Sequence, residues 1–220
     1  MKNLQRLGGI AALIGAATNL LALGVYITVL APIEGRDPGK ILAFLADNQA
    51  FMRVYYQIIY LVFGVCLIFV SLALYERLKA GSPMLALAVI TFGLIWAFLV
   101  IVMGTLSINN LSTVVKVYGE NPAQAATVKL TLDAVEIGLG NNGGETMINA
   151  LWLLLLSWAA LRARELTRVL NYLGVVVGVA GILSVVLASP APMAVYGLGL
   201  ILWLVWLGIV MLRRSPVSAA

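Results

Sequence analysis

Long apolar runs alternate with short polar segments along the chain, and this alternation sets the expected fold. An α-helix needs about 20 predominantly apolar residues to cross the hydrocarbon core of a bilayer. Six runs come close to that length, at about residues 8–30, 54–75, 84–106, 144–161, 169–188 and 193–212. The pattern predicts an all-α polytopic integral membrane protein with six transmembrane helices, built as a single membrane domain over residues 1–220.

The two longest polar connectors carry helix-start signals of their own. Asp37-Pro38 offers a capping side chain followed by a proline at the first helical position, which predicts a short helix. That helix lies either in the membrane interface or in an ordinary capped loop. Asn121-Pro122 has the same form, so we expect the third helix to pass beyond the membrane surface and a second helix to return. The extended third helix and the returning helix predict a helical outer cap over about residues 107–139.

The basic residues indicate the orientation of the helices. With six spans and both termini in the cytoplasm, nine of the 14 lysines and arginines fall on the cytoplasmic side and five on the outer side. An excess of lysine and arginine in the short loops is typical of the cytoplasmic face. The sequence thus predicts cytoplasmic termini, and the net charge of +5 requires no nucleic-acid partner. Only 10% of the residues are charged, against about a quarter in soluble domains. The six spans take up most of the 220 residues, so we expect no separate soluble domain.

Few residue types that support cofactor or acid–base chemistry are present. The chain has no histidine and one cysteine, Cys66, which lies inside an apolar run. The usual ligand sets of zinc, haem and iron–sulfur sites are therefore missing, so we expect no metal, no cofactor and no internal disulfide. No nucleophile motif is recognisable. No catalytic residue is assigned, and a non-enzymatic role is favoured.

Two segments at the ends of predicted spans resemble a known family. They are Leu74-Tyr75-Glu76-Arg77-Leu78 and the stretch from Arg168 to Val175, which reads Arg-Val-Leu-Asn-Tyr-Leu-Gly-Val. Together with the order of the spans, they resemble the uncharacterised bacterial multi-span membrane family known as domain of unknown function 4386, over most of the chain. The resemblance implies a multi-pass protein of the bacterial cytoplasmic (inner) membrane. It implies no activity and no functional residues.

The stretch Gly138–Asn149 is the main candidate for a functional site, because it places four glycines, three asparagines and Glu145 at the start of an apolar run. Glu145 precedes Arg162 by 17 residues, or about 25 Å of helix, so we expect it near the outer boundary of the hydrocarbon core. A helix broken at Gly140–Gly144 would expose backbone groups that line a substrate or ion site, as in many transporters. A kinked helix start capped by its own asparagines is the alternative.

We predict an outward-facing polar cluster that binds a ligand. Its candidate residues are Glu145, Asn141, Asn142, Asn109, Asn110 and Asn149. Asn19 and Asn149 lie 13 residues from Arg6 and Arg162, which puts both about 20 Å from the cytoplasmic surface. A buried amide needs a hydrogen-bonding partner, so we predict an interhelical Asn19–Asn149 pair, bonded directly or through water.

Two other polar groups have structural interpretations. Tyr55, Tyr56 and Tyr60 open the second apolar run, so we expect their rings at the level of the lipid headgroups. Lys129 precedes Asp133 by four residues in the outer connector, a spacing that predicts an ion pair on a solvated helix face.

Three function classes follow, and the sequence leaves the choice open. A non-enzymatic binding, accessory or sensor protein with an outward-facing polar cluster is favoured by elimination. A small-solute or ion transporter or channel using Glu145 is the alternative; a closed cup ending at Asn149 would favour binding, and a polar conduit continuing inward would favour transport. A lipid-modifying membrane enzyme is the third class. We expect the bilayer as a partner, with a small polar ligand or lipid at the outer face and a second copy or a partner membrane subunit as further candidates.

Overall fold

The computed structural model describes residues 2–33, 37–140 and 143–213, and all regular secondary structure in these ranges is helical. The elements are α1 (Lys2–Val25), η1 (Tyr26–Leu30), α2 (Pro38–Asp47), α3 (Gln49–Tyr56), η2 (Gln57–Val62), α4 (Phe63–Leu78), α5 (Pro83–Glu120), α6 (Pro122–Leu139), α7 (Gly144–Arg162), α8 (Arg168–Leu187) and α9 (Pro190–Arg213). The two η elements are π-helical segments that directly follow α1 and α3. The all-α fold predicted from the apolar runs is confirmed.

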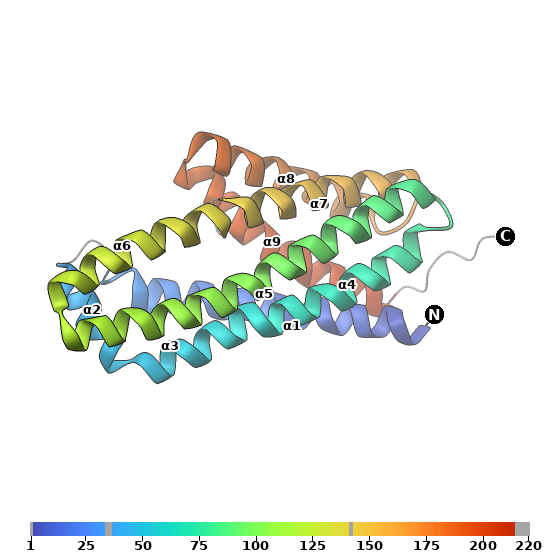
Figure 1. Ribbon diagram of the computed structural model, residues 1–220. Helices are drawn as coiled ribbons and strands as arrows, with labels where there is room; N and C mark the ends of the chain where they lie inside the picture. Colours follow the sequence, from blue (N-terminus) through green and yellow to red (C-terminus); the bar gives the residue numbers. More distant parts are fainter. Residues whose placement is uncertain (1, 34–36, 141–142, 214–220) are drawn as a thin grey trace.

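Six helical stretches are long and apolar enough to cross a membrane. They are Asn3–Leu30, Gln49–Leu78, Pro83–Glu120, Pro122–Arg162, Arg168–Leu187 and Pro190–Arg213. The predicted number of spans is therefore confirmed within the described residues. α1 begins and α9 ends at the same end of the bundle, called the terminal end below (Figure 1). The opposite end, called the far end, is formed by α2 and by the turn between α5 and α6 (Figure 1).

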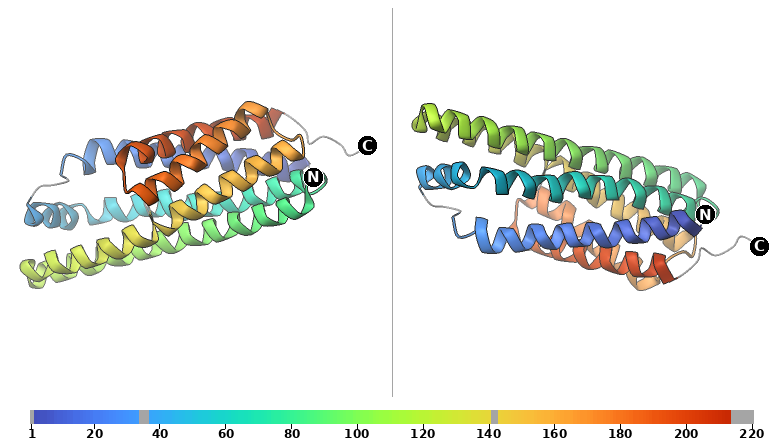
Figure 2. Two further views of the ribbon diagram at one scale, coloured as in Figure 1. Left: turned by 90° about the horizontal axis from the view of Figure 1, so that it is seen from above. Right: turned by 90° about the horizontal axis from the view of Figure 1, so that it is seen from below.

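The spanning helices pack in a ring that follows chain order. α1 packs on α4, α4 on α5, α5 on α7, α7 on α8 and α8 on α9, and α9 returns to α1. Figure 2 shows α9 beside α1, although these helices are the last and the first of the chain. Trp96, Trp152 and Trp203 lie in the core, at most 1% exposed, with neighbouring ring centroids 5.3 and 5.7 Å apart. The large indole groups of these three tryptophans fill the interior of the helix bundle.

α5 extends well beyond the ring. Its 38 residues span roughly 57 Å at 1.5 Å per residue, against about 30 Å for a hydrocarbon core. α6 returns along it, and the two helices project together toward the far end (Figure 2). The Asn121 side chain caps α6 by accepting a hydrogen bond from the Gln124 backbone N–H at 3.2 Å. The helical extension expected after the third span is therefore present.

The short helix α2 packs against this extension. Asp37 Oδ1 accepts a hydrogen bond from the Gly39 backbone N–H at 3.3 Å, so the predicted N-cap is confirmed. Leu42 is buried in a cluster with Val114 of α5 and Ala125 of α6. α2 is thus held by apolar contacts with the protein, in addition to its cap.

Candidate functional site

The helix breaks within the glycine-rich stretch, which is one of the two alternatives that the sequence left open. α6 ends at Leu139 and α7 begins at Gly144. A Cβ at Gly143 would overlap the carbonyl oxygens of Ile137 and Gly138, so only glycine fits there. Asn141 and Asn142, two of the predicted ligand-binding residues, lie outside the described residues.

Glu145 lies in the first turn of α7, and its side chain is turned into the bundle. The residue is 8% exposed, and Trp96 Nε1 on α5 donates a hydrogen bond to Glu145 Oε1 at 3.2 Å. The position near the helix N-terminus favours a carboxylate, because the first backbone N–H groups carry partial positive charge. The ion pairs of the described chain do not include Glu145. Counting residues located this carboxylate along the helix but did not reveal its burial.

A cavity of about 70 Å³ lies beside this carboxylate. Its lining comes from four of the six spans: Asn19, Ala22, Ile59, Tyr60, Phe63, Val100 and Glu145. A space of that size holds several water molecules or one small ion. We call this space the Glu145 cavity.

Tyr60 and Trp96 are the site residues that sequence reasoning missed. Tyr60 lies in the π-helical segment η2 and lines the Glu145 cavity. Tyr55 is buried, with only 7% of its surface exposed. The expected position of these rings at the headgroup level stays a prediction. A π-helical turn inserts a residue and redirects side chains, and no sequence signal announces it here. For Trp96 a signal existed, since tryptophan prefers the membrane interfaces and this one stands in the middle of a span.

Asn149 lies one helical turn from Glu145, on the same face of α7. It is fully buried, and its Nδ2 donates a hydrogen bond to the Tyr196 hydroxyl of α9. Its Oδ1 has no hydrogen-bond partner among the described residues.

The predicted direct bond between Asn19 and Asn149 is wrong. Asn19 Nδ2 donates to the Gly15 carbonyl of its own helix at 2.8 Å, and Asn149 bonds to Tyr196 instead. An amide can satisfy its N–H group on the preceding turn of its own helix, which removes the need for an interhelical partner. A water-bridged pair stays a prediction.

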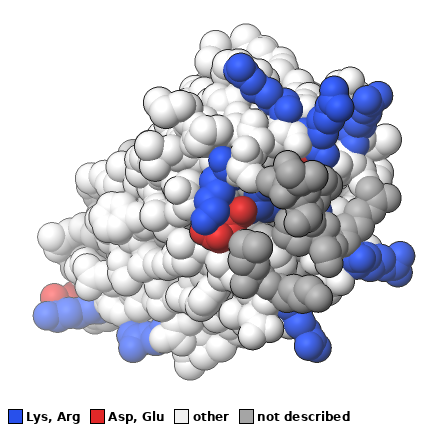
Figure 3. Space-filling view, turned by 90° about the vertical axis from the view of Figure 1, so that its right-hand side faces the viewer, with Lys and Arg blue, Asp and Glu red and all other residues white. Residues whose placement is uncertain are grey.

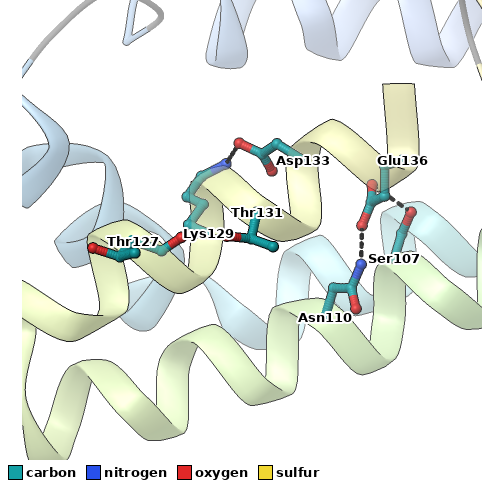
Figure 4. Close-up of polar contacts among 7 residues, drawn as sticks. All are labelled: Ser107, Asn110, Thr127, Lys129, Thr131, Asp133 and Glu136. Atoms are coloured by element: carbon teal, nitrogen blue, oxygen red, sulfur yellow. Dashed lines mark hydrogen bonds and ion pairs between the residues drawn. The ribbon is translucent and has the colours of Figure 1, made fainter. Parts of the chain in front are cut away.

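The other predicted asparagines belong to a different cluster, between α5 and α6. Asn110 Nδ2 and Ser107 Oγ donate to the two oxygens of Glu136 at 2.6 and 3.0 Å (Figure 4). The predicted Lys129–Asp133 ion pair is confirmed, with 2.5 Å between Nζ and Oδ2. A second cavity of about 40 Å³ lies beside these groups.

Asn109 is exposed, whereas its neighbour Asn110 is buried against Glu136. Adjacent residues on a helix point in directions about 100° apart, so only one of the two can face α6. The single polar cluster expected from the sequence is thus divided between the Glu136 group and the Glu145 cavity.

A family model described as Domain of unknown function (DUF4386) matches residues 7–208 of the 220-residue chain. The chain belongs to this family. The match runs from within α1 to within α9, so the ring of helices apart from the start of α1 and the end of α9, together with the Glu145 cavity, falls inside the DUF4386 domain. Comparison with curated proteins and with solved structures found no match. The DUF4386 description names no activity, and the function has to be argued from the site.

The chemistry available in the DUF4386 cavity is that of a hydrogen-bond acceptor. Glu145 contributes a carboxylate, and Asn19 has its Oδ1 left to accept because its Nδ2 is bonded to Gly15. The rings of Tyr60 and Phe63 add aromatic surface. No group of three or more His, Cys, Asp or Glu residues that could hold a metal ion occurs in the part of the chain that the structure describes. The arrangement suits a positively charged hydrogen-bond donor better than it suits acid–base catalysis.

Proposed function

We propose that this protein is a non-enzymatic membrane binding protein whose ligand is a small monovalent cation of the ammonium type, held at Glu145. One observation carries the proposal: Glu145 is a buried carboxylate that lines a cavity and makes no ion pair within the described chain. A buried carboxylate without a basic partner must hold a proton or be balanced by a bound cation. The cavity gives such a cation space next to the charge.

The aromatic lining supports an ammonium ion. Tyr60 and Phe63 border the cavity, and Phe63 also contacts Trp96 edge-on, with 5.5 Å between the ring centroids. The faces of such rings attract cations within about 6 Å of the ring centre, most strongly where water is excluded. An N–H donor could bond to Glu145 and to Asn19 Oδ1 while its charge rests against the rings.

The packing around the cavity supports binding more than transport. Trp96, Trp152 and Trp203 contact one another in tilted and edge-on geometry in the core and are almost completely buried. Leu153 and Leu156 on α7 are fully buried at the same depth. A conduit continuing inward would need polar lining and space where these side chains are close-packed.

Transport through the same site is the second candidate, and the break between α6 and α7 favours it. Broken helices are common in transporter ion sites because their free backbone groups can hold the ligand. Uptake of a radiolabelled ammonium probe into sealed proteoliposomes distinguishes the two: a binding protein retains only stoichiometric label, whereas a transporter accumulates label with time. No contact described above favours a lipid-modifying enzyme.

We infer a location in the bacterial cytoplasmic membrane with both termini in the cytoplasm. The number of spans is even, and the terminal end carries the arginine-rich turn Arg162–Arg168, as the positive-inside rule requires of a cytoplasmic face. The site then opens toward the outer half of the bilayer. Such a placement suits a sensor or an accessory subunit that responds to an external cation.

Titration of the purified protein with methylammonium tests the proposal. Trp96 touches Glu145, so tryptophan emission should change saturably on binding, and thermal unfolding should shift to higher temperature. The variant Glu145→Gln keeps a hydrogen-bond acceptor for Trp96 but removes the charge, and we expect at least a tenfold loss of affinity. Glu136→Gln is the matched control, because that carboxylate lies in the other cluster. The proposal fails if Glu145→Gln binds as tightly as the wild type, or if methylammonium gives no saturable response, whether or not Na⁺ or K⁺ gives one.

A further inference from the structure

The turn between α7 and α8 presents three arginines at the terminal end. Arg162, Arg164 and Arg168 are exposed, and none of them forms an ion pair within the described residues. Figure 3, which looks onto this end, shows Lys and Arg side chains spread around its rim. Arg6 of α1 and Arg213 of α9 are also exposed and unpaired in the described chain.

The one acidic residue of the turn is withdrawn from this surface. Glu165 lies between the arginines in sequence, yet its Oε2 accepts a hydrogen bond from Arg77 Nε at 2.7 Å, with side chains only 6% and 2% exposed. The Glu165 backbone is held as well, because its carbonyl accepts from Asn171 Nδ2 at 3.2 Å. The burial of Glu165 leaves a turn whose exposed charges are all positive.

Two of the three arginines occupy places that an arginine does not prefer. Arg164 has φ 54° and Leu166 has φ 61°, a left-handed conformation that is strained in residues other than glycine and asparagine. Arg168 is the first residue of α8, where its positive charge opposes the helix dipole. Local stability therefore does not explain these arginines, and strain of this kind is characteristic of functional segments.

The far end of the molecule lacks this surplus of positive charge. In the described residues it carries four basic side chains, Lys40, Arg53, Lys116 and Lys129, and five acidic ones, Asp37, Asp47, Glu120, Asp133 and Glu136. At the terminal end both acids are engaged, Glu165 by Arg77 and Glu76 by Lys79 at 2.7 Å. The hydrogen bond that Lys79 Nζ donates to the Glu76 carboxylate raises the pKa of Lys79.

We propose that the arginine turn, Arg162, Arg164 and Arg168, is a binding site for the phosphate headgroups of anionic phospholipids. The turn joins two spanning helices, so it lies at the level of the lipid phosphates, and guanidinium groups bind phosphate through paired hydrogen bonds. Each basic residue at a membrane surface strengthens the attraction to anionic lipid by about 1 kcal/mol, or about fivefold. This inference is independent of the ligand at Glu145.

Trp158 supplies a local probe of this site. It lies one turn before Arg162 on α7 and is 55% exposed, whereas Trp96, Trp152 and Trp203 are buried. In a Trp206→Phe background, quenching by brominated phosphatidylglycerol relative to brominated phosphatidylcholine reports which lipid lies beside the turn. We expect a preference of at least fivefold for phosphatidylglycerol at low salt, and a clear decrease in 1 M salt, which screens exposed charges.

The variant Arg162→Gln/Arg164→Gln/Arg168→Gln should reduce this preference to about one. The control variant Lys40→Gln/Lys116→Gln removes exposed charge from the far end and should leave the preference for phosphatidylglycerol unchanged. Arg168→Gln alone provides a second test if the triple variant folds poorly, because it also relieves the repulsion with the α8 dipole. Equal quenching by both lipids in the wild type would overturn the proposal, and so would a preference that survives both the triple substitution and high salt.

Discussion

Glu145 is the residue on which the proposed function depends, and individual hydrogen bonds hold the side chains around it in place. Trp96 donates to the carboxylate, while the Asn149 amide, one turn away on α7, is bonded to Tyr196. In an apolar interior a hydrogen bond to a charged group is worth about 1.5–3 kcal/mol, and a group left without its partner is costly. The side chains in contact with Glu145 therefore affect stability as well as binding.

Trp96→Phe should destabilise the protein more than Trp152→Phe does. Both tryptophans are buried, and both substitutions remove the same indole volume. Only Trp96 loses a hydrogen bond, since Trp152 Nε1 has no partner among the described residues. We expect the free energy of unfolding to differ between the two variants by about 1–3 kcal/mol. Denaturant titration in mixed micelles measures this difference, and equal losses would show that the Trp96–Glu145 bond contributes nothing.

At the scale of elements, the break between α6 and α7 gives the site its geometry. A continuous helix would carry its backbone hydrogen bonds through residues 140–143 and would leave Glu145 in mid-helix, without the favourable N-terminal environment. In the second span, the π-helical segment η2 also departs from α-helical geometry, and its residue Tyr60 lines the Glu145 cavity. Two local departures from α-helical geometry therefore meet at one cavity.

Gly143→Ala should disrupt this break. The added Cβ would overlap two carbonyl oxygens, and overpacking of this kind costs about 1–3 kcal/mol. The affinity for methylammonium should also fall in Gly143→Ala, because the first turn of α7, which carries Glu145, must move to make room for the added Cβ.

Gly138→Ala is the matched control. It lies in α6, where an added Cβ meets nothing within 4 Å, and alanine favours the helix by about 0.5–1 kcal/mol. Thermal unfolding and the emission titration measure both variants. An unchanged midpoint and affinity in Gly143→Ala would contradict the role given to the break.

At the scale of the whole molecule, the Arg77–Glu165 pair ties the α4 end of the ring to the α7–α8 turn. These residues are 88 positions apart in the chain and almost completely buried. Removing one member of a buried pair leaves the other charge uncompensated, which commonly costs 3–5 kcal/mol. The pair therefore helps to hold the terminal end together.

Arg77→Met should lower the free energy of unfolding by about 3–5 kcal/mol. The double variant Arg77→Met/Glu165→Gln should lose less than the sum of the two single variants, because no unpaired charge is left behind. Lys79→Gln breaks the exposed pair with Glu76 and should have little measurable effect. Strictly additive losses in the double-mutant cycle would show that the two side chains do not act as a pair.

The candidate site was predictable only in part. Composition pointed to Glu145 and to a break near Gly143, since a carboxylate and a run of glycines are unusual at the start of a span. The pairing of Asn19 with Asn149 was inferred from equal depth alone. Depth along a helix follows from counting residues, but the direction in which a side chain points depends on the rotation of each helix against its neighbours.

The sequence by itself determined the all-α fold, the six spans and the N-caps at Asp37 and Asn121, because each depends on local properties such as apolar length and capping groups. At Gly140–Gly144 it left a broken helix and a kinked helix start as alternatives, and the structure decided for the break. Only the tertiary structure decided which polar residues meet. Trp96 joins Glu145 across 49 residues, and Asn110 joins Glu136 across 26. Such contacts depend on the rotation of each helix against its neighbours, which is set by the packing of the whole ring of helices.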